Sequence, residues 1–302
     1  MTHVANRIAF RDFFLPAIVL AAFVTIPRVS SAQSVPTGQN PSSQAAAPPP
    51  PAMEAPPVLW IERQTVPRAN QAAFIDTIHK QLEQFQEHQI VFRALGLAGA
   101  APSMDEFLFL IHFKSFAEMD QYEQRRAAMP AEFQKTMQEL EDQELKLSQS
   151  HQIIATVFRP DLSYKADAAA VAKARLLWTC QFIVPAGHVP EFESDVHFLS
   201  DTYAKAGVDD HYFMYQELAG AESQTFIVLR PMKSLADWDK PTPDVGKNLD
   251  DAGKFRLAHI WKDETLQGAG ISVDRLYVLR PDLSQTSDQF AAFDPEFWRP
   301  KK

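Results

Sequence analysis

Two histidines stand at matching positions in the chain. His79 follows Phe74 by five residues, and His197 follows Phe192 by five residues. A matched pair of imidazoles could ligate a haem iron or act as an acid and a base, because the pKa of histidine lies near neutrality. Each histidine directly follows the apolar stripe of its predicted helix and so stands at the edge of that stripe. A structural or surface histidine is therefore the favoured interpretation.

A second pattern pairs Glu193 with His197, one helical turn apart. Protein metal sites normally use three or four ligands, and the first copy of the repeat described below has Ile75 in place of Glu193. We predict no metal site.

Matched tryptophans, Trp60 and Trp178, begin two predicted strands. Two residues further on stand Glu62 and Cys180. Because strand side chains alternate between faces, each pair shares one face of its strand. If that face lines a closed interior, Glu62 is a buried carboxylate with a raised pKa that could accept a proton. If it faces outward, Glu62 is a solvated charge, and the sequence leaves both possibilities open.

Another strand face carries His211, Phe213, Tyr215 and Glu217. The corresponding residues of the first copy are much less polar. This difference is expected if only one half binds a ligand, and also if the copies merely drifted apart. We take His211 and Tyr215, with Trp60, Glu62, Trp178 and Cys180, as candidate ligand-binding residues. The acidic run from Glu139 to Glu144 is predicted to be a solvated helix face.

Composition narrows the classes of function. The chain has 302 residues, with 29 Lys and Arg against 38 Asp and Glu, a net charge of −9. An acidic protein is poorly suited to binding phosphate backbones, so no nucleic-acid partner is expected. The single cysteine excludes an intramolecular disulfide framework and a cysteine-rich metal site. Nucleotide-binding and hydrolase motifs are not found in the sequence.

The first 57 residues are predicted to lie outside the folded body. Arg7 and Arg11 precede an apolar run that is too short to span a membrane, and Ala32 ends a site suited to a signal peptidase. We therefore expect residues 1–32 to be a signal peptide cleaved after Ala32, which predicts a periplasmic or secreted protein without stable membrane insertion. Residues 33–57 are rich in proline and are expected to form a disordered linker.

The body of the chain is an internal repeat. Four segments recur in the same order at offsets of 118 to 121 residues: Leu59-Trp60 at Leu177-Trp178, Leu97–Ala100 at Leu218–Ala221, Lys114–Asp120 at Lys233–Asp239, and Arg159–Ser163 at Arg280–Ser284. We assign residues 58–164 to the first copy and 175–285 to the second. Residues 165–174 connect them, and 286–302 form an aromatic C-terminal tail.

Each copy has the pattern β-α-β-β-α-β. In the first, residues 58–66 and 90–94 are predicted strands separated by a helix over 69–88, and 96–103 is predicted to be a turn. Phe107–Ile111 is a buried strand, and Ile153–Phe158 is the last strand. This element order is the ferredoxin-like plan, whose antiparallel sheet has helices on one face only, so its other face needs a partner.

The first strand is followed by Val66-Pro67 and a helix, and the third strand by Lys114-Ser115 and a helix. On these two steps and the element order over 58–285, the sequence resembles the dimeric α/β-barrel superfamily. That group includes antibiotic-biosynthesis-monooxygenase-like and NIPSNAP-like domains. The resemblance implies an α+β fold of two tandem ferredoxin-like units packed sheet to sheet as an intrachain barrel. It also implies a range of activities, because members include oxygenases, isomerases and haem-handling proteins.

We therefore expect a cavity between the two repeats that holds a small apolar ligand. The alternatives are a cofactor-independent oxygenase or isomerase acting on a small organic substrate, or a haem-handling protein that uses His79 or His197. No cofactor is expected in the first two cases. Because a tandem barrel needs no second subunit, we expect a monomer.

Overall fold

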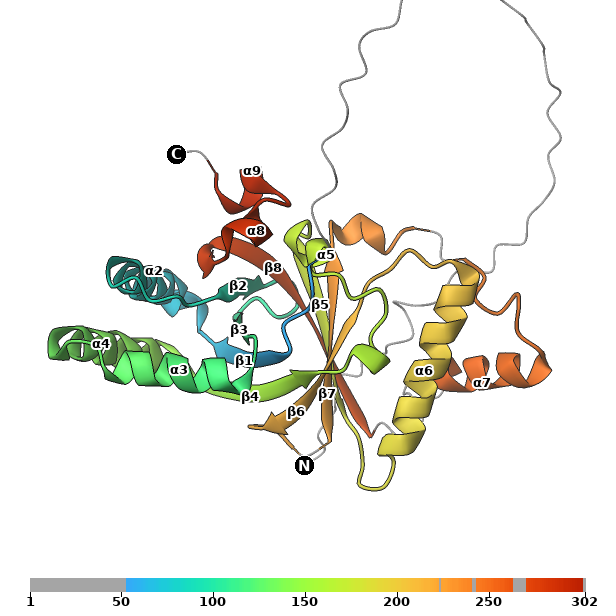
Figure 1. Cartoon of the computed structure of the whole chain (residues 1–302). Coiled ribbons are helices and arrows are strands. Elements are labelled where there is room, and N and C mark those ends of the chain that lie inside the picture. Colours follow the sequence, from blue (N-terminus) through green and yellow to red (C-terminus); the bar gives the residue numbers. More distant parts are fainter. Residues whose placement is uncertain (1–52, 223, 241–242, 263–269, 301–302) are drawn as a thin grey trace, which may run out of the picture.

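The computed structural model describes residues 53–222, 224–240, 243–262 and 270–300. These residues form an α+β fold built around a closed barrel of eight antiparallel strands (Figure 1). The predicted signal peptide and most of the predicted linker lie outside the described residues. Among the described helices, none combines the length and the hydrophobicity needed to cross a membrane.

The elements follow the predicted order in both parts of the chain. Residues 58–158 form β1 (Val58–Thr65), α2 (Gln71–Glu87), β2 (Ala94–Gly99), β3 (Glu106–Phe113), α3 (Phe116–Ala127), α4 (Ala131–Leu147) and β4 (Ser150–Phe158). Residues 176–285 form β5 (Leu176–Ile183), α6 (Val189–Ala206), β6 (Phe213–Ala219), β7 (Thr225–Met232), α7 (Asp251–Lys262) and β8 (Ile271–Gln285).

The strand order around the barrel is β1-β3-β2-β8-β5-β7-β6-β4. Read as two arcs, it gives β4-β1-β3-β2 and β8-β5-β7-β6, the same order in each half. The halves meet at two seams, where β2 pairs with β8 and β4 pairs with β6. The barrel therefore closes through the edges of both sheets, which leaves neither sheet with an unpaired edge strand.

One apolar cluster fills the inside of the barrel. It draws residues from all eight strands, including Leu59, Leu97, Leu110, Ile154, Leu177, Tyr215, Leu229 and Leu279. Separate clusters lie between each half of the sheet and its own helices. Both faces of the strands are thus buried, which explains why Phe107–Ile111 is almost continuously apolar.

Helices cover the outer face of each half. Helix α2 buries Phe74, Ile78, Leu82 and Phe85, the stripe that the helical spacing predicts. Figure 1 places α2, α3 and α4 on one side of the barrel and α6 and α7 on the other. The seams between the halves are therefore closed by strand pairing, with the helices on the outside.

The second strand differs from the prediction. Strand β2 begins at Ala94 and runs through Gly96, where a turn was expected, while Ile90 to Arg93 lie outside any strand. A Cβ atom on Gly96 would lie 2.3 Å from the backbone oxygen of Leu283 in β8. Glycine is needed here because the two strands approach closely at the seam, so it marks a strand pairing instead of a turn.

The first and last described segments, 53–57 and 286–300, pack on one mouth of the barrel. The C-terminal helices α8 (Asp288–Ala291) and α9 (Pro295–Trp298) lie over α5 (Ala168–Ala172), and Phe290 and Trp298 join the barrel cluster. The Trp298 indole donates a hydrogen bond of 2.7 Å to the backbone oxygen of Ala172. Residues 53–57, the end of the predicted linker, run into β1, and Ala55 is buried.

Candidate functional site

Two cavities lie on opposite faces of the first-half sheet. The barrel-mouth cavity lies inside the barrel, below the C-terminal helices. The helix-side cavity lies between the outer face of the sheet and helices α2, α3 and α4. Residues proposed from the sequence fall on both.

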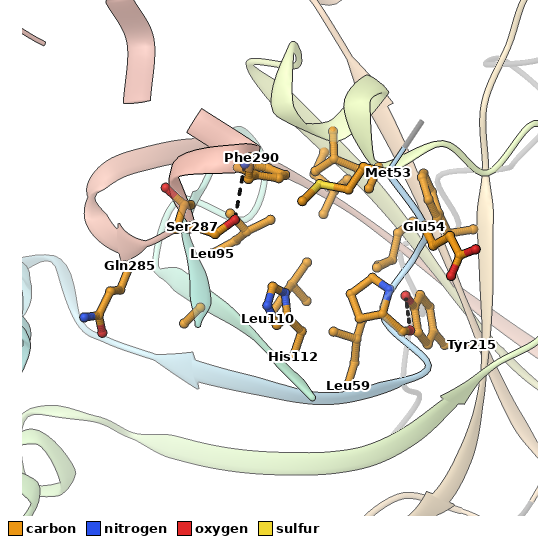
Figure 2. A pocket seen from close by; sticks show the side chains of 18 residues that line it. Met53, Glu54, Leu59, Leu95, Leu110, His112, Tyr215, Gln285, Ser287 and Phe290 are labelled. Carbon is orange, nitrogen blue, oxygen red and sulfur yellow. Dashed lines mark hydrogen bonds between the residues drawn. The ribbon is translucent and has the colours of Figure 1, made fainter. Parts of the chain in front are cut away.

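The barrel-mouth cavity has a volume of about 90 Å³. Its wall is mostly apolar and includes Leu59, Leu95, Leu110, Leu177, Phe213 and Phe290 (Figure 2). This volume is well below the roughly 300–1,000 Å³ of typical small-molecule sites, so the cavity suits only a very small ligand. A porphyrin is far larger than this space.

His112 is the imidazole that points into the barrel-mouth cavity (Figure 2). It follows Leu108 and Leu110 at alternate positions of β3, which face the barrel interior. Burial, and to a smaller extent the charge of Arg93, lowers the pKa of His112 to about 4. At neutral pH this imidazole is uncharged and can accept or donate a hydrogen bond in an apolar space.

Tyr215 lines the same cavity from β6. Its hydroxyl donates a hydrogen bond of 3.1 Å to the backbone oxygen of Pro56. Burial raises the pKa of Tyr215 well above its usual range, so it remains a neutral phenol. Its contact with Pro56 fixes the segment that precedes β1 against the barrel mouth.

The helix-side cavity is larger, with a volume of about 310 Å³, which lies within the range of small-molecule sites. Aromatic and aliphatic side chains form most of its wall: Trp60, Ile78, Leu82, Phe85, Phe92, Phe109, Ile111, Tyr122, Met137 and Ile153. Polar groups gather on part of the wall: Glu62, Gln81, Arg126, Glu141, Glu144 and His151.

A hydrogen-bonded network that includes Gln64 joins four of these polar groups, and Arg126 pairs separately with Glu141. The Gln64 amide donates to Glu62 at 2.8 Å and also to Glu144. Gln81 donates to the other oxygen of Glu144 at 2.6 Å. His151 Nε2 lies 2.8 Å from Glu62 Oε1. Strands β1 and β4 and helices α2 and α4 each contribute to this network, so folding of the first half assembles it.

The environment of the network raises the pKa values of two of its members, Glu144 and His151. Burial, and next the charge of Glu62, raises the pKa of Glu144. The hydrogen bond with Glu62 raises the pKa of His151. A carboxyl group and an imidazole whose pKa values both move toward neutrality lie beside one cavity, an arrangement common at functional sites.

Trp60 and Glu62 lie on the helix side of β1, not inside the barrel. Glu62 is neither buried in the barrel nor a freely solvated charge, because its side chain is 16% exposed and hydrogen-bonded in the helix-side cavity. Trp178 and Cys180 occupy the equivalent face of β5, where both are buried in an apolar cluster against α6. The two pairs are therefore on separate sides of the molecule.

The remaining predicted residues line neither cavity. His211 lies just before β6, where its Nδ1 atom is 2.6 Å from the backbone oxygen of Lys165. His79 lies 3.4 Å from Asp282. His197 adds to the effect of Arg159 in lowering the pKa of Asp161.

The matched histidines do not fit a haem site. They lie on α2 and α6, which Figure 1 places on opposite sides of the barrel. Neither histidine lines the two cavities described. His79 lies beside Asp282, and His197 acts on the pKa of Asp161, so each interacts with an aspartate of the repeated Arg-Pro-Asp-Leu-Ser segment in the other half.

Several site residues were missed from the sequence, among them Glu144, His112 and His151. Glu144 lies in the acidic run expected to be solvated, but it is buried. His112 could have been found from its alternation with Leu108 and Leu110. His151 begins the last strand, and no local pattern in the sequence distinguishes it.

The fold is similar to several solved structures. An anthrone oxidase-like protein is 13% identical with a TM-score of 0.47, over 77% of this chain and 94% of that one. A proposed monooxygenase from Lactobacillus acidophilus NCFM is 10% identical with a TM-score of 0.45, over 74% and 94%. A variant of the chlorite dismutase from Candidatus Nitrospira defluvii is 7% identical with a TM-score of 0.44, over 79% and 96%.

These neighbours are members of the dimeric α/β-barrel superfamily, the group that the sequence resembles. No model of a protein family matches the sequence, and no curated protein matches it. At these identities and TM-scores, the neighbours say nothing about the activity of this chain. The site has to be interpreted from its own residues.

Proposed function

We propose that this protein binds a small, largely apolar organic molecule in the helix-side cavity of its first half. The observation that carries the proposal is the cavity of about 310 Å³ in which Glu62, Glu144 and His151 meet a mostly aromatic and aliphatic wall. Small-molecule sites typically combine an apolar wall with a few convergent polar groups. The apolar wall would supply affinity, and the polar groups would orient the ligand.

Comparison of the two halves supports a single site of this kind. The positions of Glu62 and Gln64 on β1 correspond to Cys180 and Phe182 on β5. Cys180 and Phe182 are buried among apolar side chains. Buried polar groups are costly unless they are satisfied or used, so the presence of Glu62 and Gln64 on the helix side of β1 favours a function in the first half.

A cavity-filling substitution tests the proposal. Ile153→Trp places a large ring at the cavity, from a position that is 43% exposed and can accept it. Native mass spectrometry of the full chain purified from its host should detect a bound small molecule that is lost in this variant. Leu218→Trp, at a strand position 51% exposed and away from the cavity, is the matched control. Equal occupancy in both variants would reject the helix-side cavity as the site.

Catalytic conversion of the molecule bound in the helix-side cavity is the second candidate function. It is favoured by the hydrogen bond between His151 and Glu62, because a carboxylate–imidazole pair can take and return a proton. This supports an isomerase or a cofactor-independent oxygenase over a haem protein. A molecule found by mass spectrometry would be incubated with the protein and with His151→Gln. Conversion by the parent alone would support turnover, and conversion by neither would leave binding as the function.

The barrel-mouth cavity is an alternative location for a small apolar ligand. His112 supports it, since a neutral imidazole in an apolar cavity could hold one hydrogen-bonding group of a ligand. The same mass-spectrometric measurement on His112→Leu tests this location. Loss of the ligand from that variant, with retention in Ile153→Trp, would favour the barrel mouth.

We also propose that the chain is two tandem ferredoxin-like units, exported, cleaved after Ala32 and monomeric. The equal strand order of the two arcs supports the tandem units. The basic and apolar residues before Ala32 support export. N-terminal sequencing of the protein from the periplasm and its molar mass by light scattering test the cleavage and the monomer.

A further inference from the structure

The charges around the helix-side cavity are unbalanced. Three carboxylates line it, from Glu62, Glu141 and Glu144, against the guanidinium of Arg126 and the imidazole of His151, which is cationic only when protonated. Arg126 lies 2.5 Å from Glu141, and His151 lies 2.8 Å from Glu62. Among the described residues that line the cavity, none therefore offers a free cation to an anionic ligand.

The carboxylate oxygens of Glu62 and Glu144 are less fully occupied by hydrogen-bond donors. Glu62 Oε1 faces both Gln64 and His151. Among the described residues, none donates a hydrogen bond to Glu62 Oε2. Glu144 is buried, and its only described side-chain donors are the neutral amides of Gln64 and Gln81. A buried carboxylate with neutral partners favours an additional positive charge nearby, because burial otherwise disfavours its charged form.

The aromatic part of the cavity wall is suited to the body of such a cation. Phe85 and Phe92 lie 4.9 Å apart between ring centroids, and Phe92 and Tyr122 lie 5.8 Å apart. Together with Trp60 these rings line the cavity. Aromatic faces attract organic ammonium groups and also bury hydrocarbon. The volume is at the lower end of the roughly 300–1,000 Å³ range of small-molecule sites, which suits a small amine.

We propose that the ligand of the helix-side cavity is an organic amine, whose ammonium group lies at Glu62 and Glu144 and whose apolar body lies against Trp60, Phe85 and Phe92. This inference rests on the proposed function, since it names the ligand class of the same cavity. The ammonium donates hydrogen bonds to the carboxylates and competes with His151 for Glu62.

Isothermal titration calorimetry of the full chain at pH 7.5 tests the inference with two probes of equal size. These are 2-phenylethylamine, which is cationic, and 2-phenylethanol, which is neutral. The amine should bind at least about tenfold more tightly, the worth of one charge-assisted hydrogen bond. If neither probe binds, the proposed function fails. If the alcohol binds as tightly as the amine, the proposed function stands and the amine inference is overturned.

Two substitutions should change amine affinity in opposite directions. Glu62→Gln should weaken amine binding about tenfold while leaving alcohol binding within about twofold. His151→Gln removes the competing cation and should strengthen amine binding about threefold or more. A purely structural role for the network would make both substitutions weaken both probes.

The exposed Glu83 of α2 provides the matched control, and Glu83→Gln should alter neither affinity. Alcohol binding reports whether Glu62→Gln is folded. If Glu62→Gln does not fold, the test depends on His151→Gln alone. Stronger amine binding by His151→Gln supports the inference, and unchanged or weaker amine binding overturns it.

Discussion

Ser284 accepts a hydrogen bond of 2.9 Å from the backbone amide of Gly96, across the seam between β8 and β2. At the other seam, Ser163 accepts a hydrogen bond of 2.9 Å from the backbone amide of Met214. Both serines end the repeated segment Arg-Pro-Asp-Leu-Ser. The segment Arg-Pro-Asp-Leu-Ser therefore provides the same type of contact at both seams between the halves.

Each serine also donates a hydrogen bond within its own Arg-Pro-Asp-Leu-Ser segment. Ser163 Oγ donates to the backbone oxygen of Arg159 at 2.7 Å, and Ser284 Oγ donates to that of Arg280 at 2.7 Å. Each hydroxyl thus satisfies one acceptor in its own half and one donor in the other half. The proline of each segment fixes the backbone between them.

Replacing either seam serine with alanine should destabilise the whole barrel. Ser163→Ala and Ser284→Ala each leave a strand amide without its acceptor, which costs about 1–2 kcal/mol in free energy of unfolding. The two sites are far apart, so the losses should add in the double variant. Urea denaturation measures them. Ser150→Ala, which removes a hydrogen bond within the first half, should cost less. A seam variant as stable as the parent would contradict this role.

Much of the barrel was predictable because its local patterns are strong. The helical spacing of Phe74, Ile78, Leu82 and Phe85 requires one apolar surface for α2. The apolar run of β3 requires burial on both faces, which a lone ferredoxin-like sheet does not provide. In the structure the missing partner is the second half of the same barrel, whose strands close it.

The second strand and most of the site depend on contacts far apart in the sequence. Gly96 looks like a turn residue until its closeness to Leu283 is known. The face of β1 that carries Glu62 was ambiguous because both faces of a barrel strand are buried. Glu144 looks solvated in its acidic run, and only its packing against Gln64 and Gln81 shows otherwise.

His112 should make stability fall in mild acid. Its pKa is lowered to about 4 in the folded state, whereas an unfolded histidine titrates near 6.5. Between these values only the unfolded chain takes up the proton. Stability is therefore complete above pH 6.5 and falls as the pH drops toward 4, by roughly 2–3 kcal/mol.

Urea denaturation of the parent and of His112→Leu from pH 7.5 to 4 tests this pH dependence. The variant should lose this part of the pH dependence, whereas the exposed His88→Gln should keep it. An unchanged profile for His112→Leu would show that the imidazole of His112 is solvated instead of buried in the barrel mouth.

Glu144 should make stability change with pH in the direction opposite to that of His112. Burial and the charge of Glu62 raise its folded pKa above the unfolded value. The folded state is then favoured most at low pH, and that advantage is lost as the pH rises through the folded pKa. Glu144→Gln cannot ionise, so its stability relative to the parent should improve between pH 4.5 and pH 8. Glu139→Gln, on the exposed face of the same helix, should show no such change. A constant difference across this range would refute the assignment.

Trp298 should hold the C-terminal helices on the barrel mouth. Its side chain is 3% exposed and donates to Ala172, so Trp298→Ala should cost about 3–5 kcal/mol in free energy of unfolding. Trp298→Phe keeps a ring but loses the donor, and should cost about 1–2 kcal/mol. Phe255→Ala, at a side chain 74% exposed, should change little. Urea denaturation measures all three. If Trp298→Ala costs less than about 1 kcal/mol, the tail does not contribute to the core, and the barrel-mouth cavity has no stable cover.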